Sequence, residues 1–273
     1  MTRAKSTQER SVVSPSVLSP SLRLLSPATG PRAPLRLLTF PYAAAGAYTY
    51  RPWAALLPDH VELVGIQLPG REDRFHAAPL DDLPTVVNGL LAEIAAVADD
   101  GADWAVLGHS LGAVLACEVA SGLTTTYGAA PPRHVMVSGC PALHLVHRNR
   151  QPVHELGDPE LVEHMRSLNG TPEEILADPT IMELLLRLVR ADYSLFDQYQ
   201  HQDGKLLTSP LTVFVGDTDP STSPELVEPW AQLTTSTCEV HTLPGDHFFV
   251  NESREQLVRL VGEVLDTDET SQP

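Results

Sequence analysis

The sequence predicts an α/β fold with a mostly parallel central sheet, helices on both faces and a helical insertion. From Leu35 onward, short apolar runs alternate with amphipathic segments, which is the pattern of a parallel sheet covered on both faces. A Gly- and Ser-containing turn joins one apolar run directly to a helical stretch. Residues 152–205 break the alternation with helical patterns and no convincing strand.

The expected strands are short apolar runs rich in Leu and Val. They are Leu35–Phe40, Val61–Gln67, Trp104–Leu107, His134–Ser138, Leu211–Val215 and Glu239–Leu243. The stretches between them have the apolar spacing of helices. These are Tyr50–Leu57, Leu83–Val97, Leu111–Gly122, Glu225–Leu233 and a closing helix at Glu252–Leu265. Right-handed crossovers between parallel strands then fix the broad winding of the chain.

The chain is expected to divide into a leader and one domain. Residues 1–33 are rich in Ser and Pro without a sustained period, so we expect a flexible leader in which Leu22 to Leu25 lie against the domain as an irregular arm. Residues 34–273 have the length and apolar content of a single domain.

The insertion at 152–205 contains two helical patterns, Pro159–Leu168 and Pro179–Tyr199. An insertion between the fourth and fifth strands lies above the carboxyl edge of the sheet, where an active site needs a lid. A helical hairpin unrelated to access is the alternative, and we favour the lid.

Composition excludes several classes of function. A net charge of −17 argues against a nucleic-acid partner, because phosphate binding needs a basic face. No apolar run is long enough to span a bilayer and no secretory pattern begins the sequence, so we expect a cytoplasmic protein without a membrane partner. The cysteines are scattered and the histidines lack a ligand spacing, so no metal site is expected.

The most specific motif of the sequence is Gly108-His109-Ser110-Leu111-Gly112. It follows one expected strand and opens the next expected helix, which is the setting of a nucleophile elbow. A serine at so sharp a turn needs small neighbours at 108 and 112, because larger side chains would clash there. The helix that follows directs its free N–H groups at developing negative charge. Ser110 is therefore the expected nucleophile of an α/β-hydrolase fold.

An acid and a base follow in the order serine, aspartate, histidine that this fold uses. Asp217 and Asp219 lie just past one expected strand, and His247 lies just past the next. His247 is expected to accept the serine proton and return it to the leaving group, while an aspartate orients the imidazole. Asp219 is preferred because hydrolases of this fold tend to place the acid three residues after the strand-end glycine. Asp217 then supports the turn, and Asp246 is the third candidate.

Two backbone N–H groups are expected to form the oxyanion hole. One belongs to Leu111, which follows the nucleophile. The other comes from the loop after the first strand, Phe40–Gly46, whose small residues let the backbone approach a substrate. Tyr42 is the first choice in this loop and Ala43 the second.

Several further segments of the sequence, together with the nucleophile elbow, form a recognisable combination of motifs. They are Phe40-Pro41-Tyr42-Ala43, Gln67-Leu68-Pro69-Gly70-Arg71-Glu72-Asp73-Arg74, Asn169-Gly170-Thr171-Pro172-Glu173, Arg190-Ala191-Asp192-Tyr193 and Pro244-Gly245-Asp246-His247-Phe248-Phe249. With these segments the sequence resembles the type II thioesterases that accompany modular polyketide and nonribosomal peptide synthases. The resemblance extends over nearly the whole chain from Leu35 to Leu265.

The resemblance implies a thioesterase that acts on the phosphopantetheine thioester of acyl or peptidyl carrier proteins and clears stalled or misprimed chains. No cofactor is expected, because water and the triad suffice for thioester hydrolysis, and a monomer is the default expectation. The family usually has paired glycines where Ala44 and Ala45 stand here, and a positive φ is costlier for alanine. Arg71 and Arg74 either contact an acidic carrier protein or hold their own loop through Glu72 or Asp73, and we favour the structural role.

Three other functions remain open at this point. A lipase or carboxylesterase acting on free esters uses the same fold and triad. The second is a product-releasing thioesterase, which should favour one long or cyclising chain, whereas an editing enzyme should tolerate many short acyl groups. A non-catalytic module that binds carrier proteins is the third, although an intact serine, aspartate and histidine argue against it.

Overall fold

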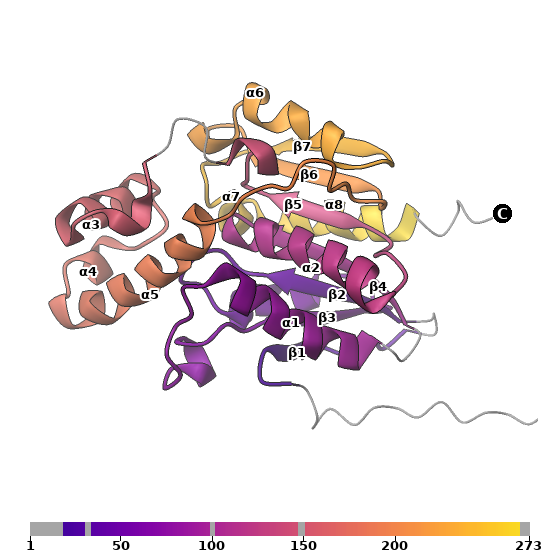
Figure 1. The fold of residues 1–273 in the computed structure, drawn as a ribbon, viewed down its shortest axis with the longest axis horizontal. Coiled ribbons are helices and arrows are strands. Elements are labelled where there is room, and N and C mark those ends of the chain that lie inside the picture. The colour runs from indigo at the N-terminus through magenta and orange to yellow at the C-terminus, as the bar shows by residue number, and fades with distance from the viewer. Residues whose placement is uncertain (1–18, 31–33, 99–101, 147–150, 268–273) are drawn as a thin grey trace, which may run out of the picture.

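The computed structural model describes residues 19–30, 34–98, 102–146 and 151–267. Its strands form one sheet in the order β1-β3-β2-β4-β5-β6-β7 (Figure 1). Their bounds are β1 (Leu22–Ser26), β2 (Leu35–Phe40), β3 (Val61–Ile66), β4 (Asp103–His109), β5 (Val135–Ser138), β6 (Leu211–Gly216) and β7 (Cys238–Leu243). All neighbouring pairs are parallel except β1 with β3. The predicted mostly parallel sheet is confirmed.

The strand β1 corrects the expectation for the leader. Instead of an irregular arm, Leu22 to Ser26 form an edge strand that pairs antiparallel with β3 and places Leu22 opposite Ile66. Leu22 is 1% exposed and belongs to the same apolar cluster as α1 and α2. Its burial next to β3 outweighs the Ser- and Pro-rich surroundings that obscured it in the sequence. The other leader residues, 1–18 and 31–33, lie outside the described residues.

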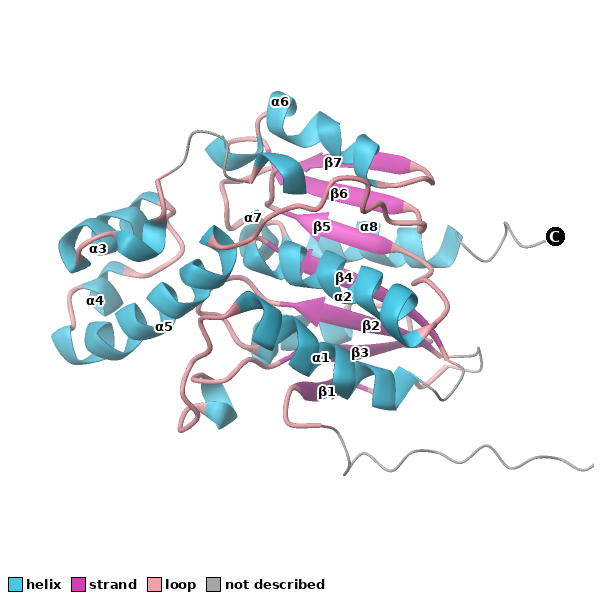
Figure 2. Cartoon of the chain, in the orientation of Figure 1, coloured by secondary structure: helices cyan, strands magenta, loops and turns pink. Residues whose placement is uncertain are grey.

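Helices cover both faces of the sheet, as predicted (Figure 2). One face carries α1 (Leu83–Ala98), α2 (Leu111–Tyr127) and the short α6 (Pro224–Val227). The other face carries α7 (Phe249–Glu252), α8 (Arg254–Thr267) and a 3-10 helix at Ala47–Ala55.

Three expected helices differ from the structure in form. The helix expected at Tyr50–Leu57 is the 3-10 helix Ala47–Ala55, which contains Pro52. The helix expected at Glu225–Leu233 divides into α6 and a 3-10 turn at Glu228–Leu233. Proline explains the first two changes, because Pro52 and Pro229 lack the N–H that an α-helix needs. The closing helix, expected at Glu252–Leu265, is α8, which begins at Arg254, and the unexpected short α7 precedes it.

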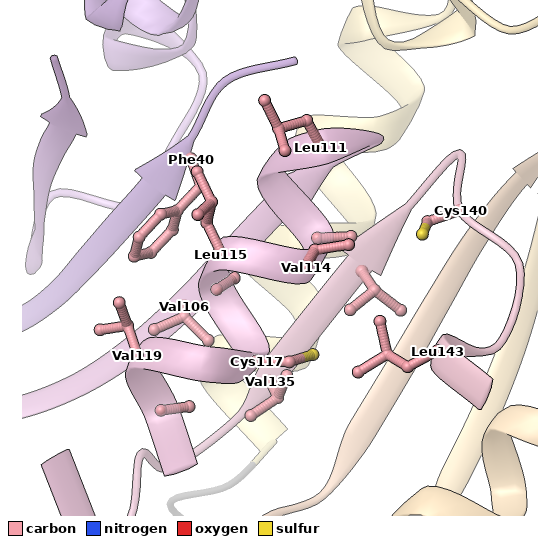
Figure 3. Close-up of a cluster of buried hydrophobic side chains, with 14 of the residues drawn as sticks. Phe40, Val106, Leu111, Val114, Leu115, Cys117, Val119, Val135, Cys140 and Leu143 are labelled. Atoms are coloured by element: carbon pink, nitrogen blue, oxygen red, sulfur yellow. The ribbon is translucent and has the colours of Figure 1, made fainter. Parts of the chain in front are cut away.

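The helix α2 is the most deeply buried helix next to the site. It packs against β4 and β5, and the close-up in Figure 3 shows side chains of α2 together with apolar side chains of the neighbouring segments. The labelled members are Phe40, Val106, Leu111, Val114, Leu115, Cys117, Val119, Val135, Cys140 and Leu143. Because this helix is fixed along its length, the serine at its amino end is held by the core and not by a loop.

The insertion between β5 and β6 is helical, as predicted. It consists of a 3-10 turn at Val153–Glu155, α3 (Asp158–Ser167), the unexpected short α4 (Glu173–Leu176) and the long α5 (Pro179–Asp197). These helices lie beyond the carboxyl ends of the strands (Figure 1). They have an apolar cluster of their own, made by Val153, Leu161, Met165, Leu176, Met182 and Val189.

Within the described residues, none of the helices combines the length and apolar character that crossing a membrane requires. The same residues contain no group of His, Cys, Asp and Glu side chains arranged to hold a metal ion.

Candidate active site

Ser110 occupies a strained turn between β4 and α2. Its φ is 55° and its ψ is −117°, a conformation that costs free energy for any residue with a Cβ. The turn is held by the Ser110 N–H, which donates to the carbonyl of Ser138 at 2.8 Å. The structure thus confirms the strand–turn–helix setting that the motif predicted.

The glycines beside the serine are required by close backbone contacts. A Cβ on Gly108 would lie 2.0 Å from the carbonyl oxygen of Gly112, and a Cβ on Gly112 would lie 2.0 Å from that of Phe40. Any side chain at either position would therefore push α2 away from β2 and β4. The close approach also places the start of α2 beside the loop that follows β2.

The base and the preferred acid meet directly. Nδ1 of His247 lies 2.9 Å from Oδ2 of Asp219, whose side chain is only 1% exposed. This bond leaves Nε2 of His247 as the nitrogen available to a serine. Ser110 and His247 line the same cavity, and among the described residues no hydrogen bond joins them.

The charge of Asp219 is stabilised by its partners. Burial alone would raise the pKa of this carboxyl. The hydrogen bond and charge of His247, with two hydrogen bonds from Ser221, instead lower the pKa to about 2. Asp219 is therefore a carboxylate at neutral pH, as a group that stabilises an imidazolium must be.

The other two acidic candidates have different partners. Asp217 accepts a hydrogen bond from the Gly245 N–H at 2.9 Å and so supports the turn, as expected. Asp246 accepts hydrogen bonds from the Phe248 N–H and from the amide of Asn169. Among the described carboxylates, only Asp219 is bonded to His247.

Ser221 is a site residue that the sequence analysis missed. Its hydroxyl lies 2.6 Å from Oδ1 of Asp219 and 3.2 Å from Nδ1 of His247, and its N–H donates to the same Oδ1. The Asp219-Pro220-Ser221 sequence is typical of a turn closed by the aspartate side chain. That signal predicts the backbone bond, but not the hydroxyl contact with the histidine.

Two backbone N–H groups of the loop after β2 belong to residues that line the same cavity as Ser110. The Ala44 N–H donates to Asp192 and the Ala45 N–H to the carbonyl of Tyr42. Among the described residues, the N–H groups of Tyr42 and Ala43 have no protein acceptor. Tyr42 is fixed by its ring, whose centroid lies 5.1 Å from that of Phe248.

The N–H of Leu111 is in the first turn of α2, where backbone donors have no partner within the helix. Leu111 and Ala43 line one cavity together with Ser110 and His247. Leu111 and the second-choice donor Ala43 therefore border the same cavity as the serine.

Two cavities meet at Ser110 and His247. The larger, of about 770 Å³, lies between the loop after β2 and the lid helices. The smaller, of about 230 Å³, lies toward the segment after β5. Both walls are mostly apolar, and Leu168 and Tyr193 of the insertion line both cavities. The insertion therefore forms part of the walls of both cavities, which favours the expected lid over an unrelated hairpin.

His109 is a second buried imidazole beside the base. It is fully buried, its Nδ1 lies 2.9 Å from the hydroxyl of Ser138, and its ring centroid is 5.2 Å from that of His247. Burial, followed by the nearby His247, lowers the pKa of His109 to about 3. His109 is thus neutral at neutral pH and adds no positive charge next to His247.

Comparisons with known proteins agree with this geometry. Residues 35–265 match the family model of the thioesterase domain. The chain therefore belongs to the thioesterase domain family and is a hydrolase of thioesters. A relative in Aneurinibacillus migulanus, gramicidin S biosynthesis protein GrsT, is 35% identical over 229 residues, which cover 84% of this chain and 88% of the relative.

A solved structure is similar over most of its length. The type II thioesterase BorB from the borrelidin biosynthetic cluster is 32% identical, with a TM-score of 0.77 over 90% of this chain and 97% of that chain. Its likeness supports the α/β-hydrolase fold and the class of enzyme that the sequence predicted.

One similar protein carries the name of a different class of enzyme, a dehydrogenase. Linear gramicidin dehydrogenase LgrE from Brevibacillus parabrevis is 36% identical over 251 residues, which cover 91% of this chain and 94% of the relative. The present sequence contains no Gly-x-Gly and so lacks the Gly-x-Gly-x-x-Gly signature of dinucleotide binding. The elbow and the Asp219–His247 pair support the thioesterase assignment.

The buried His109 predicts a pH dependence of stability. Its pKa in the folded protein, about 3, lies below the ordinary 6.5, so the unfolded chain binds more protons between these values. The contribution of the neutral His109 imidazole to the free energy of unfolding is therefore fully present above pH 6.5 and is lost as the pH falls toward 3. Urea unfolding should show that the free energy of unfolding falls about 2 kcal/mol more in the native protein than in His109→Gln between about pH 7 and about pH 5. Parallel curves for the two proteins would contradict the burial of a neutral imidazole.

Proposed function

We propose that this thioesterase hydrolyses acyl thioesters on the phosphopantetheine arm of acyl or peptidyl carrier proteins. In this role it clears stalled or misprimed chains during polyketide or nonribosomal peptide biosynthesis. The observation that carries the proposal is the bond from Asp219 to His247, whose imidazole lines the same cavity as Ser110. The family match and the names of the related biosynthetic proteins support the substrate class.

The proposed chemistry uses Ser110, His247 and Asp219 as the triad. His247 Nε2 removes the hydroxyl proton as Ser110 Oγ attacks the thioester carbonyl, and Asp219 stabilises the imidazolium that forms. The oxyanion accepts hydrogen bonds from the N–H groups of Leu111 and Tyr42. Its collapse breaks the carbon–sulfur bond, and the imidazolium gives its proton to the departing thiolate. Water then repeats the sequence on the acyl-serine and releases a carboxylic acid.

The proposed domain organisation differs in one respect from the one expected from the sequence. The catalytic unit is residues 34–273 with the lid at about 152–205, extended by β1 from the leader. We further propose that the protein works as a monomer in the cytoplasm and that a carrier protein brings the substrate to the cavity mouth. It needs no cofactor, since water and the triad suffice for thioester hydrolysis.

The substrate class is tested with a matched pair of small substrates. An acyl-pantetheine thioester and its oxygen ester place the same acyl group and arm in the site, so their rates compare the leaving atoms alone. We expect higher kcat/KM for the thioester and no turnover of either by Ser110→Ala. Preference for the oxygen ester would indicate a carboxylesterase.

The editing role is tested on carrier proteins loaded with different acyl groups. Intact-mass measurement follows the loss of each acyl group from its carrier. Unloading of several short acyl groups at similar rates supports editing. Unloading of one long chain alone, with no short group removed, would show a product-releasing thioesterase instead.

The assignment of the acid is tested with two isosteric substitutions on one turn. Asp219→Asn removes the charge next to His247, and we expect kcat for the thioester to fall by ~10,000-fold. Asp217→Asn changes a carboxylate whose one hydrogen bond within the described part of the chain supports a turn, so its kcat should stay within about tenfold of the native value. The opposite order of the two losses would move the acid to Asp217.

A further inference from the structure

A buried ion pair joins the loop after β3 to the lid. Arg71 forms two parallel hydrogen bonds with Asp192 of α5, at 2.7 Å from Nη1 to Oδ2 and 2.8 Å from Nη2 to Oδ1. Their side chains are 4% and 0% exposed. Charges removed from water to this extent persist only with close partners. The pair therefore holds α5 in a defined position on the domain.

The same carboxylate also binds the loop that carries the expected oxyanion donor. Oδ2 of Asp192 accepts a hydrogen bond from the Ala44 N–H at 2.7 Å. Nη1 of Arg71 donates to the carbonyl of Ala45 at 3.1 Å. The ion pair thus holds two consecutive residues of the loop, directly after Tyr42 and Ala43.

Ala44 needs this support because its backbone is strained. Its φ is 64°, in the left-handed region that favours glycine. A residue with a Cβ keeps such a conformation only when its surroundings fix it. The two supports for Ala44 both come from the lid, since its N–H binds Asp192 and its side chain packs on the lid cluster defined above.

The end of α5 that carries Asp192 is itself attached to the main domain. The hydroxyl of Ser194 and the amide of Gln198 both donate to the carbonyl of Asp81, at 3.3 and 3.1 Å. Asp192 therefore transmits the docked position of α5 to the loop after β2.

We propose that Asp192 is a positioning residue for the oxyanion hole. By holding the Ala44 N–H, it keeps Ala44 at positive φ and so directs the N–H groups of Tyr42 and Ala43 toward the oxyanion of the Ser110 adduct. The oxyanion hole is then complete only when the carboxyl end of α5 is docked. This inference rests on the proposed function, because it assigns a support to the proposed oxyanion donors.

The test uses two double variants that differ in one hydrogen-bond acceptor. Arg71→Met combined with Asp192→Asn keeps an oxygen that can accept from Ala44. Arg71→Met combined with Asp192→Leu has the same shape without that oxygen. Neither variant leaves a buried charge unpaired, so both avoid the main cause of misfolding.

Steady-state hydrolysis of an acyl-pantetheine thioester gives kcat and KM for each variant, and thermal unfolding confirms that both are folded. We expect kcat to be at least about tenfold lower with Asp192→Leu than with Asp192→Asn, with KM within about threefold, because a displaced donor weakens transition-state binding. Equal kcat values in the two folded variants would overturn the inference.

Adding Ala44→Gly distinguishes positioning from general damage. Glycine adopts positive φ without help, so Ala44→Gly should recover most of the kcat lost with Asp192→Leu. Failure to recover would overturn the role through Ala44. The lid control is Asp158→Asn, which removes the exposed ion pair with Arg190 and should leave kcat unchanged.

The outcomes separate this inference from the proposed function. If the native protein hydrolyses the thioester and Ser110→Ala does not, the proposed function stands whatever the Asp192 variants show. If the native protein itself fails to hydrolyse the thioester, the proposed function fails and the positioning role fails with it.

Discussion

The strained backbone of Ser110 is the constraint on which the site depends. A serine at φ 55° leaves no room for a Cβ at Gly108 or Gly112, because each glycine is in contact with a backbone carbonyl. The strain is balanced by the burial of α2 against the centre of the sheet. The same contacts bring the first turn of α2 against the end of β2, so that one packing arrangement places the serine and both sides of the proposed oxyanion hole.

Two buried pairs of hydrogen-bonded side chains perform different tasks above this framework. Asp219 and His247 form the pair that the proposed chemistry uses, and Ser221 supplies additional hydrogen bonds to the carboxylate. Arg71 and Asp192 form the second pair, which attaches the lid to the loop after β2. A buried ion pair contributes little net stability, because desolvation offsets most of the attraction. What this pair does provide is a fixed geometry between the lid and the main domain.

The central sheet, the strands β2 to β7 and the helical insertion could be predicted from the sequence because each rests on a local pattern. Apolar runs of strand length and a Gly-Ser turn do not depend on distant contacts. β1 escaped prediction because its burial depends on pairing with β3, which lies far along the chain. The short α4 and the 3-10 helices escaped because proline and tertiary packing decide their form.

The candidate site likewise combines residues that local sequence patterns predict with contacts that depend on distant parts of the chain. Ser110, Asp219 and His247 were predicted from their places at strand ends, and the contact between the last two agrees with the expected choice of acid. The partner of Arg71 was predicted wrongly. Its loop neighbours Glu72 and Asp73 were expected, whereas it binds Asp192, which is 121 residues away. The hydroxyl of Ser221 and the neutral state of His109 likewise follow only from three-dimensional packing.

The central claim is that Ser110 receives an acyl group from a carrier protein. It is tested most directly by mixing an excess of acyl-loaded carrier protein with the native protein, quenching the reaction with acid within the first turnover, and mapping the acyl mass by peptide analysis. We expect an acyl group on the peptide that contains Ser110, and none on the corresponding peptide when the Ser110→Ala variant replaces the native protein. Unloading of the carrier by the native protein with no acyl group ever found on Ser110 would contradict it.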